Sequence, residues 1–213
     1  MLKKLLSSIL ALSFIFTLSL SSFASGSSPS AKEIVEKGEL VESEILSTDK
    51  GAYKKEIYSY TKALPLTRSS EQEFEQSTCV MLTPMTSRSD DGFFADATEH
   101  ALTLRIRYVV RSYADDYSDM LGYRLTRVVV ENNGSDTQTD HLTAMNHSGK
   151  FGEDTREYDL SGETAPFVVT KYPNYSNYVA NVITAAVGAR VSYYWDVLGI
   201  DDTVDVFVFN NGY

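Results

Sequence analysis

Five arginines are spaced so that they could form one basic surface. In residues 98–112, apolar residues occupy one parity and polar residues the other, which is the period of a β-strand with one face on a core and one in water. The polar parity carries Arg105, Arg107 and Arg111, and the next apolar run carries Arg124 and Arg127. Guanidinium groups bind carboxylates and phosphates well. They either bind an anionic polymer of a cell envelope or pair with acids on neighbouring strands, and we favour the pairing.

Aromatic residues form a second group whose types and spacing could bind a ligand. Tyr172, Tyr175 and Tyr178 repeat at every third residue, and residues 193–195 read Tyr-Tyr-Trp. Exposed aromatic rings offer a sugar an apolar face with a polar edge, but the same residues fill sandwich cores, and we favour packing. The candidate binding residues taken from the two groups are Arg105, Arg107, Arg111, Arg124, Tyr175 and Tyr178.

Residue patterns for catalysis or metal binding are weak. His141 and His147 lack the compact spacing and the further ligands of a zinc site. No G-x-S-x-G sequence supports a Ser-His-Asp triad, and a carboxylate pair for glycoside hydrolysis needs a cleft that one sequence cannot establish. We therefore assign no catalytic residue, no metal and no cofactor. Solvated turns are favoured over calcium sites for the acidic groups, which match no EF-hand spacing and comprise Asp90, Asp91, Asp96, Asp115, Asp116, Asp119, Asp201 and Asp202.

The chain has a single cysteine, Cys79, so it forms no intramolecular disulfide. Its stability must therefore come from packing and sheet hydrogen bonds. The apolar neighbours Val80, Met81 and Leu82 predict a buried, inert thiol, since no nearby group would lower its pKa to make it a nucleophile.

The elements that would hold these residues are mostly β-strands. Residues 40–48 and 52–61 predict a hairpin, because a glycine suited to a short turn lies between them. A helix over 53–64 is the alternative, but Tyr, Ile and Thr in this run favour a strand. Residues 98–112 and 121–131 predict a longer antiparallel hairpin around a polar turn.

Strands continue to the C-terminus and define the fold class. Residues 178–187 fit either a helix or a buried strand, and we favour the strand. Many short strands separated by turn residues predict an all-β fold, an antiparallel β-sandwich or an open barrel. The further predicted strands are 138–145, 166–171, 189–197 and 203–209.

The N-terminal residues predict export. Lys3 and Lys4 precede an apolar run, and Ser22-Phe23-Ala24 has the small side chains of a cleavage site, so residues 1–24 are expected to be a signal peptide. Residues 25–38 are expected to be a flexible arm, with a possible helical turn over 31–37. Residues 39–213 are expected to be a single β-sandwich domain.

Net charge excludes one class of partner. The formal charge of −10 becomes −12 when residues 1–24 are removed, because that segment holds two lysines and no acid. Nucleic acids attract basic surfaces, so we expect no nucleic-acid partner. No transmembrane segment is expected after cleavage, and the remaining partners are a cell-wall polymer or another extracellular protein.

The chain resembles a group of small secreted proteins of Gram-positive bacteria. The resemblance covers residues 98–213 and is carried by the runs GYRLTRVVV, VGARVSYYW and FVFNNG. It implies a disulfide-free β-sandwich and transfers no catalytic residue. We therefore expect a secreted, non-catalytic binding or envelope-associated module. The alternatives are a secreted hydrolase with an unrecognised site and a bacteriocin-like effector.

Overall fold

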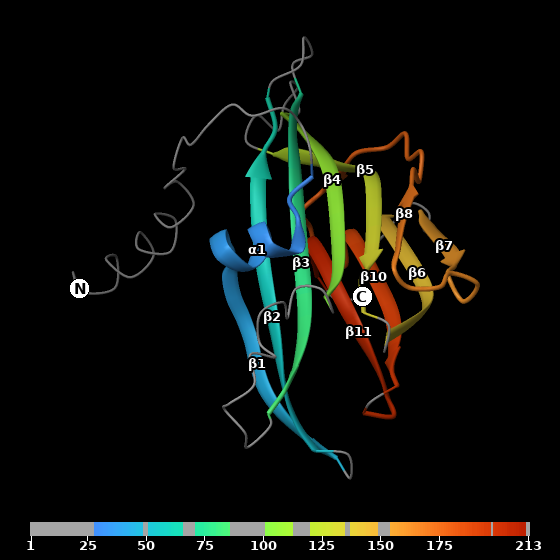
Figure 1. Cartoon of the computed structure of the whole chain (residues 1–213). Helices are drawn as coiled ribbons and strands as arrows, with labels where there is room; N and C mark the ends of the chain where they lie inside the picture. Colours follow the sequence, from blue (N-terminus) through green and yellow to red (C-terminus); the bar gives the residue numbers. More distant parts are fainter. Residues whose placement is uncertain are drawn as a thin grey trace, which may run out of the picture.

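Two antiparallel sheets face each other and confirm the predicted all-β sandwich (Figure 1). The computed structural model describes residues 28–48, 51–65, 71–85, 101–112, 120–134, 137–148, 154–196 and 198–211. Within these residues the chain forms one short helix and eleven strands, and the two sheets do not close into a barrel. The predicted signal peptide lies outside the described residues.

The larger sheet is built from the N-terminal strands in chain order, extended by two short later strands. Its strands, in spatial order, are β1 (Glu39–Thr48), β2 (Gly51–Ala63), β3 (Gln72–Pro84), β4 (Leu102–Ser112), β5 (Leu121–Asn132) and β8 (Phe167–Lys171), with β9 (Val179–Ala180) also on β5. The strands of the smaller sheet, in spatial order, are β11 (Ile200–Asn210), β10 (Ala186–Trp195), β6 (Thr137–His147) and β7 (Thr155–Asp159).

Both predicted hairpins are confirmed. β1 pairs with β2 from Glu39 opposite Ser59 to Thr48 opposite Gly51. Gly51 has a φ of 136°, a conformation that only glycine adopts without strain. β4 pairs with β5 along its whole length. Residues 53–63 are therefore strand, and the helical alternative is excluded.

Two strands and one turn differ from the sequence expectations. β3 and β7 were not predicted. Residues 178–187 are neither a helix nor one strand, because β9 ends at Ala180, a turn follows, and β10 begins at Ala186. In β3, the polar residues of one face are as buried as the apolar residues of the other, so no hydrophobic alternation marks the strand.

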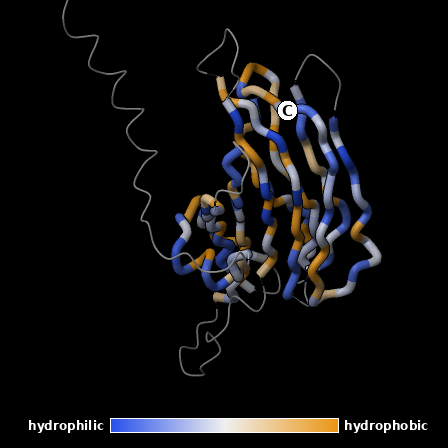
Figure 2. Tube along the Cα trace, turned by 90° about the horizontal axis from the view of Figure 1, so that it is seen from above, coloured by the Kyte–Doolittle hydropathy of each residue, from blue (hydrophilic) through white to orange (hydrophobic). Residues whose placement is uncertain are grey.

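The core lies between the two sheets. Hydrophobic and hydrophilic residues alternate along the strands (Figure 2), and the hydrophobic side chains of both sheets meet in one cluster. Tyr193 and Trp195 are both buried there and pack edge to face with ring centroids 5.2 Å apart. The packing favoured for the aromatic residues is therefore confirmed for Tyr193 and Trp195.

The helix α1 (Ala31–Lys37) covers part of the outer face of the larger sheet. The Ser30 side chain caps it by accepting a hydrogen bond from the backbone N–H of Glu33, which satisfies one free donor of the first turn. Ile34 is fully buried against Cys79 and Met81 of β3. The helical turn is confirmed, but the expectation of a flexible arm does not hold for residues 28–38, which are packed.

Side chains also connect the sheets. Lys55 of β2 donates to the carboxylate of Asp202 in β11 at 2.5 Å, and the Tyr193 hydroxyl donates to the same oxygen at 2.9 Å. The Tyr123 ring of β5 lies 5.2 Å from that of Phe209 in β11.

In the part of the chain that the structure describes, no helix has the length and apolar character needed to cross a membrane.

Candidate functional site

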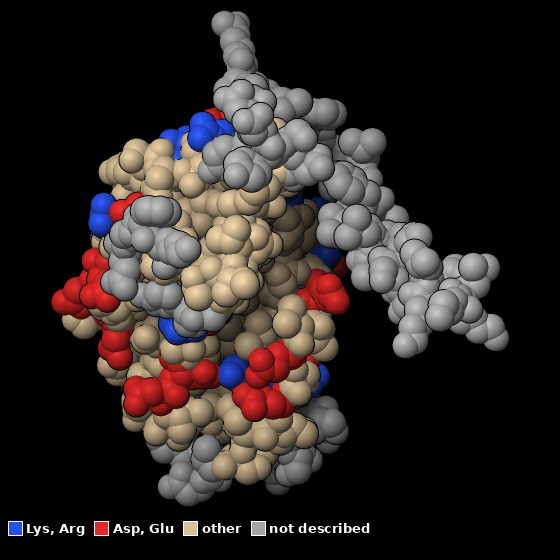
Figure 3. Space-filling view, turned by 180° about the vertical axis from the view of Figure 1, so that it is seen from behind, with Lys and Arg blue, Asp and Glu red and all other residues tan. Residues whose placement is uncertain are grey.

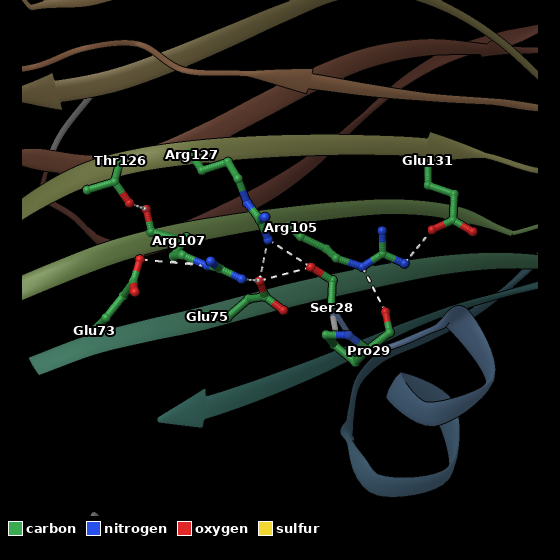
Figure 4. A network of polar contacts seen from close by, with 9 residues as sticks. All are labelled: Ser28, Pro29, Glu73, Glu75, Arg105, Arg107, Thr126, Arg127 and Glu131. Atoms are coloured by element: carbon green, nitrogen blue, oxygen red, sulfur yellow. Dashed lines mark hydrogen bonds and ion pairs between the residues drawn. The ribbon is translucent and has the colours of Figure 1, made fainter. Parts of the chain in front are cut away.

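A buried carboxylate organises the arginines on the outer face of the larger sheet (Figure 4). Glu75 of β3 is 1% exposed. Its Oε2 accepts hydrogen bonds from Arg107 Nη2 at 3.0 Å and from Arg127 Nη2 at 2.7 Å. The Ser28 hydroxyl donates to the same oxygen at 3.0 Å. Two cations and a hydroxyl therefore stabilise one buried negative charge.

The N-terminal segment closes over this network. Arg105 is 3% exposed and its Nη2 lies 2.5 Å from Oε2 of Glu131. Its Nε donates to the backbone carbonyl of Pro29 at 2.9 Å, and Arg127 donates to the Ser28 hydroxyl at 2.8 Å. Residues just before α1 are therefore held by two arginines, Arg105 and Arg127, and by the Glu75 carboxylate.

This geometry corrects one expectation about the arginine surface. Parity predicts that Arg105 points into water, whereas it is buried and donates to the Pro29 carbonyl. Arg105 and Arg107 both lie within ion-pair distance of glutamates on neighbouring strands. The pairing that the sequence favoured over polymer binding is the arrangement that the side chains adopt, and Arg105 offers no exposed donor to a ligand.

Three of the six candidate binding residues meet elsewhere on the same face. The guanidinium carbons of Arg111 and Arg124 lie 3.9 and 4.8 Å from the centroid of the Tyr178 ring, within cation–π distance. The Tyr178 hydroxyl donates to Glu71, which also lies 3.7 Å from Arg124. Partial burial and the hydrogen bond to Glu71 raise the pKa of Tyr178.

Tyr175, the sixth candidate, is part of the core. It is buried and its hydroxyl donates to the Ala144 carbonyl at 2.7 Å. Burial raises the pKa of Tyr175, so the hydroxyl stays neutral and serves as a fixed donor. Tyr172 of the same run is exposed. The repeat of tyrosines at every third residue therefore does not form one aromatic surface.

Histidines and acids do not converge on a described metal site. His141 Nε2 lies 3.8 Å from Glu157 on the neighbouring strand, and both side chains face solvent. Asp202 is engaged by Lys55 and Tyr193. Within the described ranges, no three His, Cys, Asp or Glu residues are placed to hold a metal ion. The acidic groups of residues 90–96 and 115–119 lie outside the described residues.

The predicted buried thiol is confirmed. Cys79 is fully buried beneath α1. Burial raises its pKa to about 11, so the reactive thiolate is absent at neutral pH.

A turn that the sequence analysis did not select as a site presents an exposed isoleucine on a fixed backbone. Asn211, which follows β11, donates from its side chain to the Val182 carbonyl at 2.9 Å and to the Asn181 side chain at 2.5 Å. Its backbone accepts from Thr184 and donates to Ala185, both at 2.9 Å. The turn is therefore fixed on both sides by one residue, and Ile183 at its tip is 87% exposed.

The backbone of this turn is strained. Thr184 has a φ of 69°, a left-handed conformation that is rare for a β-branched residue. Such strain costs on the order of 1–3 kcal/mol and persists only where surrounding contacts enforce it, often at functional sites. The sequence signal is weak: two apolar β-branched residues, 182 and 183, stand between Asn181 and Thr184 in a turn.

Other apolar side chains lie beside this turn. Gly122 pairs with Ala180, so the start of β5 and the end of β9 meet at one point. Met120 and Leu121 precede Gly122, and Val182 and Ile183 follow Ala180; all four are exposed. We call these four residues the loop-end patch. Polar residues flank it, since a shallow hollow beside Ile183 is lined by Ser148, Asn181, Thr184 and Asn211.

Charge is unevenly distributed over the surface. On the face shown in Figure 3, acidic side chains gather in the lower half, and basic side chains are visible at the upper edge. The chain matches no protein-family model, and no curated protein and no solved structure matches it.

Proposed function

We propose that the chain is an exported protein that acts by binding another protein of the cell envelope or its surroundings through the loop-end patch. The signal-peptide pattern of residues 1–24 supports export. The observation that carries the binding proposal is Ile183, held almost fully exposed on a strained turn. An exposed isoleucine gains no hydrophobic free energy in the isolated protein, while the strain at Thr184 costs free energy.

A protein partner suits this surface better than a polymer does. Apolar anchors surrounded by polar groups resemble the centre and rim of protein interfaces. The four exposed apolar residues lie on two segments that the pairing of Gly122 with Ala180 brings together. An anionic polymer would need accessible cations, but Arg105, Arg107 and Arg127 are bound to glutamates. A glycan would need several exposed ring faces, but Tyr175 is buried and two arginines lie over the Tyr178 ring, so Tyr172 is the exposed ring of that repeat.

The test compares Ile183→Ser with a matched control. Val168 on β8 is also an exposed aliphatic residue, 63% accessible, and β8 pairs with the opposite end of β5 from the patch. Fluorescently labelled mature protein, Ile183→Ser and Val168→Ser are titrated onto protoplasts and isolated cell walls of the producing cells. Each titration is repeated after trypsin treatment of the cells.

The proposal expects binding that trypsin treatment abolishes, that Ile183→Ser weakens at least tenfold and that Val168→Ser leaves unchanged. Loss of one large buried anchor typically has an effect of this size. Binding that survives trypsin would identify a polymer or lipid and overturn the proposal. Equal binding by Ile183→Ser and the parent protein, or no binding to either preparation, would also overturn it.

A further inference from the structure

β1 is an edge strand of unusual length and composition. It contains ten residues and, among the described strands, pairs only with β2. The backbone N–H and C=O groups along the other side of an edge strand point away from the sheet. Charges on an edge strand oppose pairing with a strand of like charge, whereas a strand of complementary charge can still be added.

The two faces of β1 differ in chemistry. Register places Leu40 opposite Tyr58 and Ile45 opposite Lys54, on the face that carries α1. Leu40 and Ile45 are exposed, as is Val41 at the irregularity in the register. The other face carries Glu42 opposite Ile57 and Glu44 opposite Lys55. An added strand would therefore meet apolar groups on one face and carboxylates on the other.

The carboxylates are only partly neutralised. β1 contains Glu39, Glu42 and Glu44 and no basic residue. Lys55 lies 3.2 Å from Glu44, but it also binds Asp202 at 2.5 Å. One cation is thus shared between two carboxylates, and this edge is negatively charged.

We propose that β1 binds an extended, basic segment of another protein by strand addition. In that segment, Lys or Arg side chains would alternate with apolar ones. The cations would face Glu42 and Glu44, and the apolar side chains would pack beside Leu40 and Ile45. Backbone hydrogen bonds supply affinity in this mode of recognition, and the alternate side chains supply specificity.

A second copy of the chain is a poor occupant. Antiparallel self-pairing centred on Ser43 would place Glu42 of each copy opposite Glu44 of the other. Like charges directly opposite one another destabilise a strand pair. The acidic composition of β1 therefore disfavours self-association and selects a basic partner.

The probes are two ten-residue peptides. The lysine peptide alternates lysine with valine, and the glutamate peptide alternates glutamate with valine. Each is titrated into the ¹⁵N-labelled mature protein and followed by NMR. The lysine peptide should shift amide signals of residues 39–48 and bind at least tenfold more tightly than the glutamate peptide. Two further lysine peptides carry methyl groups on every second backbone nitrogen, one on the lysines and the other on the valines. Only one of these two peptides should lose binding, because strand addition uses the backbone groups along one edge of the peptide.

Variants separate strand addition from general charge attraction. Glu42→Lys should weaken the lysine peptide at least tenfold. Glu157→Lys is the matched control, because Glu157 is an exposed glutamate on β7, an edge strand of the smaller sheet, and it should change nothing. Ile183→Ser should also bind the peptide normally, which makes this test independent of the loop-end patch. Equal binding of both peptides, shifts outside residues 39–48, an unchanged Glu42→Lys variant or no binding would each overturn the proposal.

Discussion

Single side chains determine whether the outer face of the larger sheet is open or covered. Glu75 is the common partner of Arg107, Arg127 and Ser28, so its one charge links β3 to β4, to β5 and to the N-terminal segment. A buried ion network adds little net stability over an apolar core, but breaking it is costly because charges remain buried without partners. Its contribution is therefore best measured by removing one charge.

Glu75→Gln should destabilise the protein by about 3 kcal/mol, because it leaves two guanidinium groups without their shared counter-charge. Urea unfolding followed by circular dichroism measures the difference. Glu157→Gln, at an exposed position, should change the free energy of unfolding by less than about 0.5 kcal/mol. Equal effects of the two substitutions would show that the Glu75 network does not stabilise the fold.

Cys79 should make stability fall at alkaline pH. Its pKa is about 11 in the folded protein against 9.0 for an unperturbed thiol, so the unfolded chain loses this proton first. The contribution of the Cys79 thiol to the free energy of unfolding is constant below pH 9 and is lost as pH rises from 9 towards 11. Between pH 8 and pH 10.5, the parent protein should lose about 2 kcal/mol more than Cys79→Ala.

Urea unfolding of both proteins at the two pH values measures this difference. The alanine variant serves as the control because all other titrating groups are shared. Identical pH dependence in the two proteins would show that the thiol titrates normally and is accessible in the folded state.

At the scale of elements, strands with one solvated face were predictable and elements defined by distant contacts were not. The hairpins β1–β2 and β4–β5 follow from local turn residues and alternation. β3 escaped prediction because Glu75 and Ser77 on its polar face are buried as deeply as its apolar residues. Local sequence indicates which face a residue occupies but not what covers that face.

The contacts of the candidate binding residues also come from segments far apart in the sequence. Parity correctly placed Arg105 and Arg107 on the polar face, but Pro29, which bonds to Arg105, lies 76 residues earlier. The pairing of Arg111 with Tyr178 depends on β9 returning to β5, and no local pattern encodes that return. The Asn211 clamp on residues 181–185 likewise joins separated segments.

Helix α1 should act as a cover for the Cys79 thiol. Ile34→Ala removes its fully buried anchor and should destabilise the packing of α1 by about 2–5 kcal/mol. Because the thiol then becomes accessible through local opening, its labelling by a thiol reagent at pH 8 should accelerate at least tenfold. Ile45→Ala, at a site 62% exposed, is the matched control and should leave the rate unchanged. Slow labelling of the Ile34 variant would contradict a covering role for α1.

At the scale of the whole molecule, polar contacts fix the sheets relative to each other at one corner of the sandwich. Lys55 reaches across to Asp202, and Tyr193 donates to the same carboxylate oxygen. Apolar packing between sheets is non-directional, whereas these hydrogen bonds fix one relative position of β2 and β11. Their coupling can be measured separately from core packing.

A double-mutant cycle with Lys55→Met and Asp202→Asn should give a coupling free energy of about 1–2 kcal/mol. Each single variant leaves a charged partner behind, so the double variant should lose less stability than the sum of the two single losses. Urea unfolding of all four proteins provides the cycle. Additive losses would show that the contact between the sheets contributes nothing of its own.

The strand order of the smaller sheet also constrains when the chain can fold. β10 lies between β11 and β6, so β6 waits for residues about 40 positions later before it gains its central neighbour. Pairings between such distant segments make folding slow. A ribosome must therefore synthesise the chain as far as β10 before the second layer can assemble. Under the proposed export this delay is useful, because an unfolded polypeptide can thread through a narrow translocation channel, whereas a completed sandwich cannot.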